Sequence, residues 1–219
     1  AALVAMLAGA TAALMFAILA LTLRANQYAA GLALTLVGAG LSTFFGDGFG
    51  AAPLTAITQI SIPFLSSIPV IGPLLFRYDP MVYIAIALVP IIWFVLYRTK
   101  AGLVIRVIGE SPQSAHAIGY NVIRVRYLST LFGGAMAGLG GAYLALAYTP
   151  LWVPNMTAGK GWIALALVVF SGWRPVRVML GAWLFGGVTI LQLHAQGFGI
   201  DVPSQLLSAL PYVATIFVL

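Results

Sequence analysis

Four long stretches of this chain contain no charged residue. They are residues 1–23, 25–46, 80–97 and 127–149. The hydrocarbon core of a bilayer is about 30 Å thick, so about 20 apolar helical residues are needed to cross it. Each stretch is close to this length or exceeds it, and we therefore predict four membrane-spanning helices.

Three shorter apolar segments follow at 161–173, 178–193 and 203–219. With 62% hydrophobic and 6% charged residues and a mean hydropathy of +1.07, the chain has the composition of a membrane protein. The sequence predicts an all-α, polytopic transmembrane helical bundle of seven segments. Residues 1–219 would form a single membrane domain, and we expect a fragment because the chain starts and stops inside apolar runs.

The segment 161–173 is short for a full crossing. At 1.5 Å per residue it would reach only ~20 Å. It is therefore either extended by the residues before it or a broken helix that its neighbours cover.

The positions of lysine and arginine predict which loops face the cytoplasm. Alternate loops hold eight basic residues and a single acidic one, Glu110. The basic residues are Arg24, Arg98, Lys100, Arg106, Arg124, Arg126, Arg174 and Arg177. The other loops carry Arg77 and Lys160 against Asp47, Asp79 and Asp201. Because basic loops stay in the cytoplasm, residues 98–126 are predicted to be cytoplasmic and 47–79 extracytoplasmic. The net charge of +6 then reflects topology and not binding to nucleic acid.

The predicted extracytoplasmic loop is apolar at its centre, although four prolines interrupt it: Pro53, Pro63, Pro69 and Pro73. A solvated loop would be more polar. It is either a re-entrant or surface-lying cover on the bundle or a docking surface for an external partner.

No motif in the chain indicates catalysis, a metal or a cofactor. There is no cysteine, and the four acidic residues and two histidines are scattered. The stretch GKGW at 159–162 lacks the glycine spacing and the hydroxyl residue of a phosphate-binding loop. No Asp, Glu or Lys lies inside a predicted span, whereas ion-coupled pumps usually carry one. We therefore expect no enzymatic activity, no cofactor and no metal site, with any ATP hydrolysis on another chain.

Small residues recur every four positions in LFGGAMAGLGGAYLA, at Gly134, Gly138 and Ala142. Such a stripe lets the backbone of a second helix approach closely. The sequence predicts helix packing there.

Residues 109–127, GESPQSAHAIGYNVIRVRY, are much more polar than the rest of the chain. Ser111 is a candidate N-cap of a short helix, Pro112 suits the first helical position, and Gly119 is a natural stop. One face would carry the small side chains of Pro112, Ala115 and Ala117 and could enter a groove on a partner. The spacing alone leaves open a connecting loop with one turn of helix.

The stretch RVIGESPQSAHAIGYNVIRVRYLSTLFGGAMAGLGGAYLAL resembles the conserved cytoplasmic loop and following helix of ABC-transporter permeases for branched-chain amino acids, simple sugars and nucleosides. LRANQYAAGLAL, NMTAGKGWIALALVVFSGWRPV and IDVPSQLLSALPYVATIFVL are similar to the nucleoside branch of this group. The likeness extends over nearly the whole chain, with four motifs in the same order.

The resemblance implies a permease of the bacterial inner membrane that moves nucleosides or simple sugars by alternating access. Its partners would be cytoplasmic ATP-binding subunits, a second permease subunit and an extracytoplasmic substrate-binding lipoprotein. In that group the polar insert is the coupling helix, which sits in a cleft of the ATPase. The corresponding residues here are Glu110, Ser111, Pro112, Ala115, Ala117 and Gly119. The Glu-Ala-Ala of the older signature is replaced by Ala115-His116-Ala117. A secondary transporter or channel without ATPases is the alternative, followed by a polytopic membrane enzyme.

Neutral polar residues near the segment ends are candidates to line a translocation route: Asn26, Gln27, Thr157, Gln192 and Gln205. Amides and hydroxyls would suit an uncharged nucleoside or sugar. Each residue could instead cap a helix or bond to a neighbouring helix.

Overall fold

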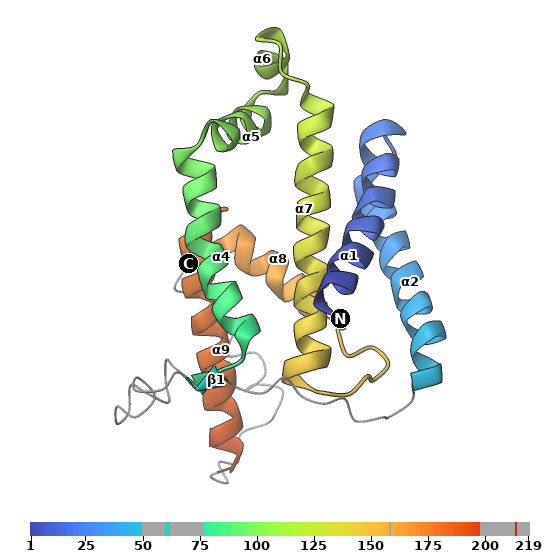
Figure 1. Ribbon diagram of the computed structural model, residues 1–219, viewed down its shortest axis with the longest axis vertical. Helices are drawn as coiled ribbons and strands as arrows, with labels where there is room; N and C mark the ends of the chain where they lie inside the picture. Colours follow the sequence, from blue (N-terminus) through green and yellow to red (C-terminus); the bar gives the residue numbers. More distant parts are fainter. Residues whose placement is uncertain (50–59, 62–76, 158, 198–212, 214–219) are drawn as a thin grey trace. The chain divides into compact units, whose positions relative to one another are not determined.

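The computed structural model describes residues 1–49, 60–61, 77–157, 159–197 and 213 (Figure 1). Apart from one antiparallel pair of two-residue strands, β1 (Ile60–Ser61) and β2 (Arg77–Tyr78), their regular structure is helical. An apolar segment in a bilayer must satisfy its backbone N–H and C=O groups internally, and a helix does so. The predicted all-α class is confirmed.

The chain divides into two compact units. Unit 1 comprises Ala1–Ile84 and Lys100–Ala158, and unit 2 comprises Ala85–Thr99 and Gly159–Leu219. Helix α4 (Pro80–Arg98) starts in unit 1 and lies mostly in unit 2. The single membrane domain stays a prediction.

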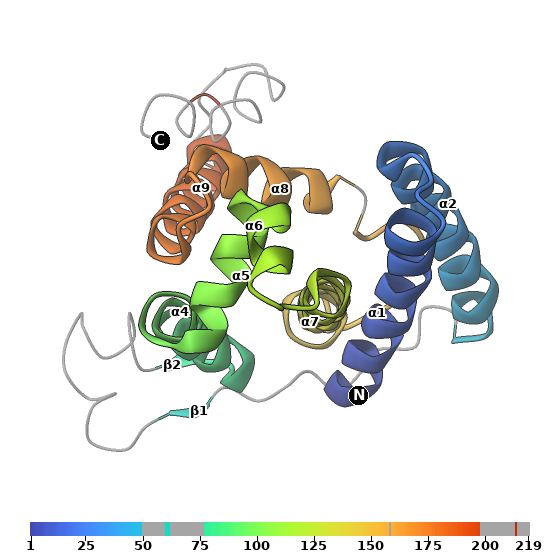
Figure 2. The same ribbon diagram turned by 90° about the horizontal axis from the view of Figure 1, so that it is seen from above.

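The elements of unit 1 are α1 (Ala2–Ala17) with the π-helical turn η1 (Ile18–Thr22), α2 (Gln27–Gly46) with the 3-10 turn η2 (Asp47–Phe49), α5 (Lys100–Glu110), α6 (Pro112–Ala117), and α7 (Val122–Tyr143) with the π-helical turn η3 (Leu144–Tyr148). Unit 2 contains α8 (Lys160–Phe170) and α9 (Pro175–Gly197) besides most of α4. Figure 2 shows the helices from the end that carries α6.

In the described part of the chain, four helices are long and apolar enough to cross a membrane. They are Ala2–Thr22, Gln27–Gly46, Pro80–Arg98 and Val122–Tyr148. Each overlaps one of the four long uncharged stretches and so confirms those predictions. Helix α8 and the apolar part of α9, Pro175–Leu191, are shorter. Except for residue 213, the predicted segment 203–219 lies outside the described residues, and the count of seven stays a prediction.

Helix α8 ends well before the predicted boundary at 173. It has 11 residues, about 16 Å of helix. The amides of Gly172 and Trp173 donate to the carbonyls of Val169 and Val168, and both residues have a φ of 61°. This left-handed turn stops the helix, because its hydrogen bonds close the last turn instead of continuing it.

Helices α1 and α7 pack against each other in opposite directions. A Cβ placed at Gly134 of α7 would overlap the Cβ of Ala13 in α1, and one at Gly138 would overlap the carbonyl oxygen of Ala5. A Cβ at Gly9 would lie 2.9 Å from the backbone nitrogen of Gly138. At these positions the two backbones are in direct contact. Dispersion between closely spaced backbones is a main source of helix association in lipid.

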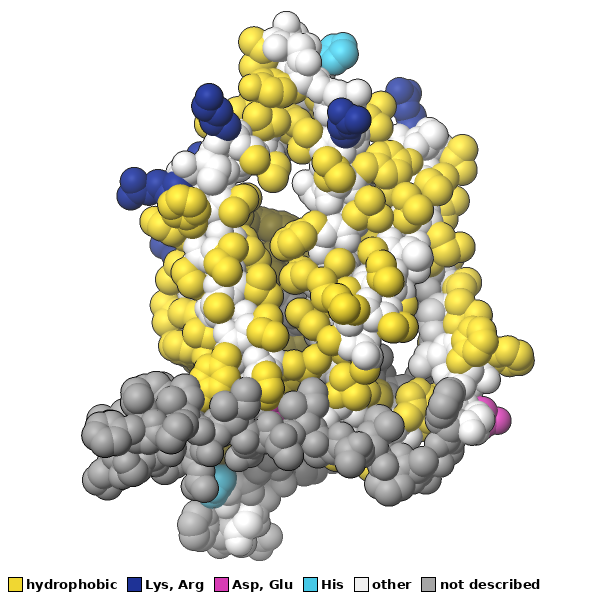
Figure 3. Space-filling model, in the orientation of Figure 1, with side chains coloured by type: hydrophobic (Ala, Val, Ile, Leu, Met, Phe, Trp, Pro, Cys, Tyr) yellow, Lys and Arg dark blue, Asp and Glu magenta, His cyan; other side chains and the backbone are white. Residues whose placement is uncertain are grey.

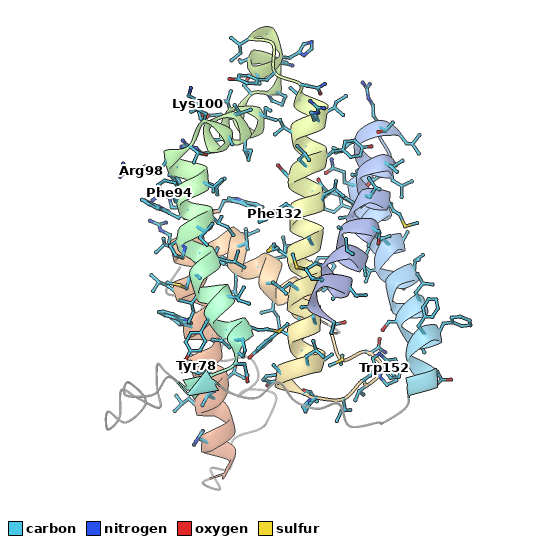
Figure 4. The ribbon with its side chains drawn as sticks, in the orientation of Figure 1. Tyr78, Phe94, Arg98, Lys100, Phe132 and Trp152 are labelled. Carbon is cyan, nitrogen blue, oxygen red and sulfur yellow. The ribbon has the colours of Figure 1, made fainter. Side chains whose placement is uncertain are left out.

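The far end of α2 is covered by the segment after η3. Trp152 from this segment lies against Gly46, where an added Cβ would overlap its indole ring (Figure 4). Gly46 is buried, whereas most of α2 is exposed. The absence of a side chain at Gly46 therefore creates the space that the indole occupies.

Candidate functional site: the polar helix between α5 and α7

Helix α6 (Pro112–Ala117) has six residues, less than two turns, and its start is defined by a side-chain cap. Ser111 is its N-cap, and the hydroxyl of Ser111 accepts a hydrogen bond from the amide of Ser114 at 3.3 Å. Pro112 occupies the start of the helix, where its missing N–H leaves no hydrogen bond unmade. The predicted helix, its cap and its proline are present in the structure.

The end of α6 is equally defined. The amide of Gly119 donates to the carbonyl of His116 at 2.9 Å, and that of Tyr120 donates to the carbonyl of Ala115 at 3.1 Å. These two bonds form a Schellman motif, which places the residue after the cap in a left-handed conformation. Gly119 has a φ of 89°, which glycine adopts without a Cβ penalty. Six residues thus keep a helical shape through hydrogen bonds at both ends.

The side chains of α6 point to two different sides. Ala115 is 0% exposed, whereas Ala117 and Gly119 are exposed and Ile118 is 68% exposed. Helix α6 contacts both α5 and α7, and Ala115 lies on the side that faces the protein. Ala115 therefore supports α6 from inside this chain, and the partner-facing set stays a prediction. Glu110 is exposed, and Ser111 and Pro112 are half-buried.

Helix α7 begins directly after this segment. Asn121 is its N-cap, and its side-chain oxygen accepts from the amide of Arg124 at 3.0 Å. One turn later, the hydroxyls of Tyr127 and Thr22 are hydrogen-bonded at 2.5 Å, which joins α7 to η1. The helix therefore starts five residues before the predicted boundary at 127 and includes Arg124 and Arg126.

The proposed route residues do not come together in unit 1. Asn26 is the N-cap of α2, and its side-chain oxygen accepts from the amides of Tyr28 at 2.9 Å and Ala29 at 3.3 Å. Gln27 is the exposed first residue of α2. Thr157 lies five residues after Trp152, which packs against Gly46 at the opposite end of α2.

The last two route candidates lie in the C-terminal part of the chain. Gln192 is part of α9, but its side chain is not among the described ones, and Gln205 lies outside the described residues.

Sequence reasoning missed the α1 side of the helix pair. Ala5, Gly9, Ala13 and Ala17 repeat every four residues, as Gly134, Gly138 and Ala142 do in α7. Ala17 is 0% and Ala142 is 8% exposed. The same four-residue spacing that marks α7 could have identified its partner.

Four helices long and apolar enough to cross a membrane, with the capped helix α6 between two of them in the sequence, define a polytopic membrane protein. The chain belongs to the family described as the permease component of the branched-chain amino acid transport system, which it matches over residues 1–219.

Curated relatives agree with this family. A putative glucose ABC transporter permease protein of Haloferax volcanii is 40% identical, over 96% of this chain and 71% of its own length. The nucleoside ABC transporter permease protein NupC of Lactococcus lactis is 36% identical, over 97% and 69% respectively. The guanosine ABC transporter permease protein NupQ of Bacillus subtilis is 34% identical, over 99% and 70%. No solved structure matches the chain.

Proposed function

We propose that this chain is the membrane-spanning subunit of an ATP-binding-cassette importer for nucleosides or simple sugars, in the cytoplasmic membrane. It works by alternating access, and separate ATPase subunits hydrolyse the ATP. The single observation that carries the proposal is α6, a short helix capped at both ends in a member of a permease family.

Helix α6 is suited to transmit motion from an ATPase. Its hydrogen-bonded ends let it move as one body, and Ala115 fixes it from inside. The outward side presents Ala117, Ile118 and Gly119, whose small or apolar surfaces can enter a cleft. Glu110, Ser111 and Pro112 form the edge of this contact. A second permease subunit and an extracytoplasmic binding lipoprotein complete the importer.

The substrate class follows from the chain and its relatives. The four described spans contain no Asp, Glu or Lys, and their arginines lie only near the span ends, so the middle of each span offers no charge to pair with an ionic substrate. A sugar or nucleoside needs only neutral hydrogen-bonding groups. The names of the three relatives refer to glucose, nucleosides and guanosine.

We assign the route to neutral side chains at helix ends, of which Gln192 in α9 is the first to test. Gln192→Leu should reduce uptake while the ATPase still co-purifies.

The coupling role is tested by adding a charge to the outward side of α6. Ala117→Glu in the full-length permease should abolish co-purification of the ATPase and reduce uptake at least about tenfold, because an unpaired carboxylate would be buried in the cleft. Ala101→Glu is the matched control, since Ala101 is also exposed and lies at the start of the adjacent helix α5. Equal ATPase recovery and uptake for the two variants would show that α6 is not the contact. Uptake by the permease alone, without ATPase or ATP, would instead favour a secondary transporter or channel.

A further inference from the structure

A groove of about 260 Å³ lies between η1, α5 and α7 within unit 1. Its lining combines the apolar side chains of Leu21, Ile105, Ile108 and Val125 with the polar ones of Arg126, Ser129 and Thr130. The three polar residues are spaced i, i+3 and i+4 on α7, so they share one face of that helix.

Two hydrogen-bond donors in this groove have no partner among the described residues. The hydroxyl of Thr130 donates to the carbonyl of Arg126 at 2.9 Å and is thereby satisfied. The guanidinium of Arg126 and the hydroxyl of Ser129 make no such bond within the part of the chain that the structure describes. Both residues are exposed. The groove therefore offers one cationic and one neutral donor together with apolar side chains.

The groove lies where two membrane spans end. Leu21 is in the last turn of the span Ala2–Thr22, and Arg126 is in the second turn of the span Val122–Tyr148. The hydrogen bond between Thr22 and Tyr127 holds these two ends at the same level. Polar groups at the ends of membrane spans lie near the headgroups of a bilayer.

The surroundings of the groove are strongly basic. Figure 3 shows Lys and Arg side chains around α5, α6 and the adjoining end of α7. Residues 100–126 carry four basic side chains and one acidic side chain, Glu110. This charge favours an anionic occupant. Basic pockets between membrane helices on the cytoplasmic side are suited to lipid headgroups.

We propose that this groove binds one anionic phospholipid of the adjoining leaflet. The lipid phosphate accepts charge-assisted hydrogen bonds from Arg126 and a further one from Ser129. The first part of an acyl chain lies along Leu21, Ile105 and Ile108. By contacting η1, α5 and α7 together, the lipid would stabilise the packing of α5 and α7, the two helices between which α6 lies in the sequence. None of the outward-facing residues of α6 lines this groove.

The test compares lipid retention by the full-length permease and its variants. Native mass spectrometry is performed after equilibration with phosphatidylglycerol and phosphatidylcholine of identical acyl chains. Wild-type protein should retain phosphatidylglycerol preferentially, and Arg126→Gln should lower this preference by about tenfold, the effect of losing one charge-assisted hydrogen bond. Arg124→Gln is the matched control, because it removes the same charge two residues away outside the groove. It should keep the preference.

A second variant separates the groove from general surface charge. Ser129→Trp keeps every basic residue but fills the groove, and it should lose retention of phosphatidylglycerol. A variant is scored only if it elutes as a monodisperse species like Arg124→Gln. Inorganic phosphate added in excess should not displace the lipid, since it gains nothing from the apolar side chains. Displacement by phosphate, unchanged retention in Ser129→Trp, or equal loss in both arginine variants would each overturn the proposal. So would a change of oligomeric state in Arg126→Gln without a change in lipid, which would assign the groove to a second copy.

Discussion

At the scale of single residues, Asn26 shows how one amide can start a membrane helix. Its side-chain oxygen binds two of the backbone amides that have no partner in the first turn of α2. This use of the side chain competes with the proposed role in a translocation route. Serine can also cap a helix but lacks the amide, so substitution can separate the two roles.

Asn26→Ala should lower the free energy of unfolding by about 1 kcal/mol, and Asn26→Ser by much less. The measurement is denaturant unfolding of the purified permease, together with uptake. If Asn26→Ser has normal stability but reduced uptake, the amide contacts substrate. Normal stability and normal uptake in Asn26→Ser would restrict Asn26 to capping.

Gly134 is a residue whose lack of a side chain decides a helix contact. Gly134→Leu should separate α1 from α7 and lower the free energy of unfolding by roughly 1–3 kcal/mol, the usual effect of overpacking. Its control is Gly133→Leu, because a Cβ at Gly133 meets no atom within 4 Å. Thermal unfolding of both variants provides the comparison. A similar loss of stability at Gly133 would mean that the effect arises from helix propensity or lipid contact and not from α1.

At the scale of the helix, α6 depends on the conformation of its last residues. Gly119→Val should weaken the helix end by at least about 1 kcal/mol, because a β-branched residue is strained at a φ of 89°. We expect reduced uptake with the membrane helices intact, measured by transport and by circular dichroism. Gly140→Val is the control, since Gly140 lies in α7, is exposed, and a Cβ there meets nothing within 4 Å. Normal uptake in Gly119→Val would argue against the need for a defined end of α6.

The positions of the helices were easier to predict from the sequence than which of their side chains are buried. The long spans were predictable because a bilayer requires a minimum length of apolar residues. The start of α7 was placed too late, since Arg124 and Arg126 suggested a loop, whereas long basic side chains at a helix end can reach toward water. The burial of Ala115 was not predictable, because it depends on how α5 and α7 pack around α6.

At the scale of the whole molecule, orientation rests on the unequal distribution of charge. The chain has no cysteine, so single cysteines can report the side of each loop. A cysteine in place of the exposed Ser114 should react with membrane-impermeant thiol reagents only from the cytoplasmic side. One in place of Ser66, in the predicted extracytoplasmic loop and outside the described residues, should react only from the opposite side. The reverse labelling pattern would invert the topology and remove α6 from the reach of an ATPase.

The pairing of α1 with α7 also has a consequence for biosynthesis. The hydrogen-bonded residues Thr22 and Tyr127 are 105 positions apart in the chain. A ribosome adds roughly 5–20 residues per second, so α1 is inserted roughly 5–20 s before its partner emerges. During that interval the small-residue stripe of α1 is exposed to lipid, to insertion factors, to other nascent chains and to the helices made before α7. Unit 1 therefore completes its assembly late in translation, and a ribosome that stalls before α7 would release a membrane helix open to incorrect pairing.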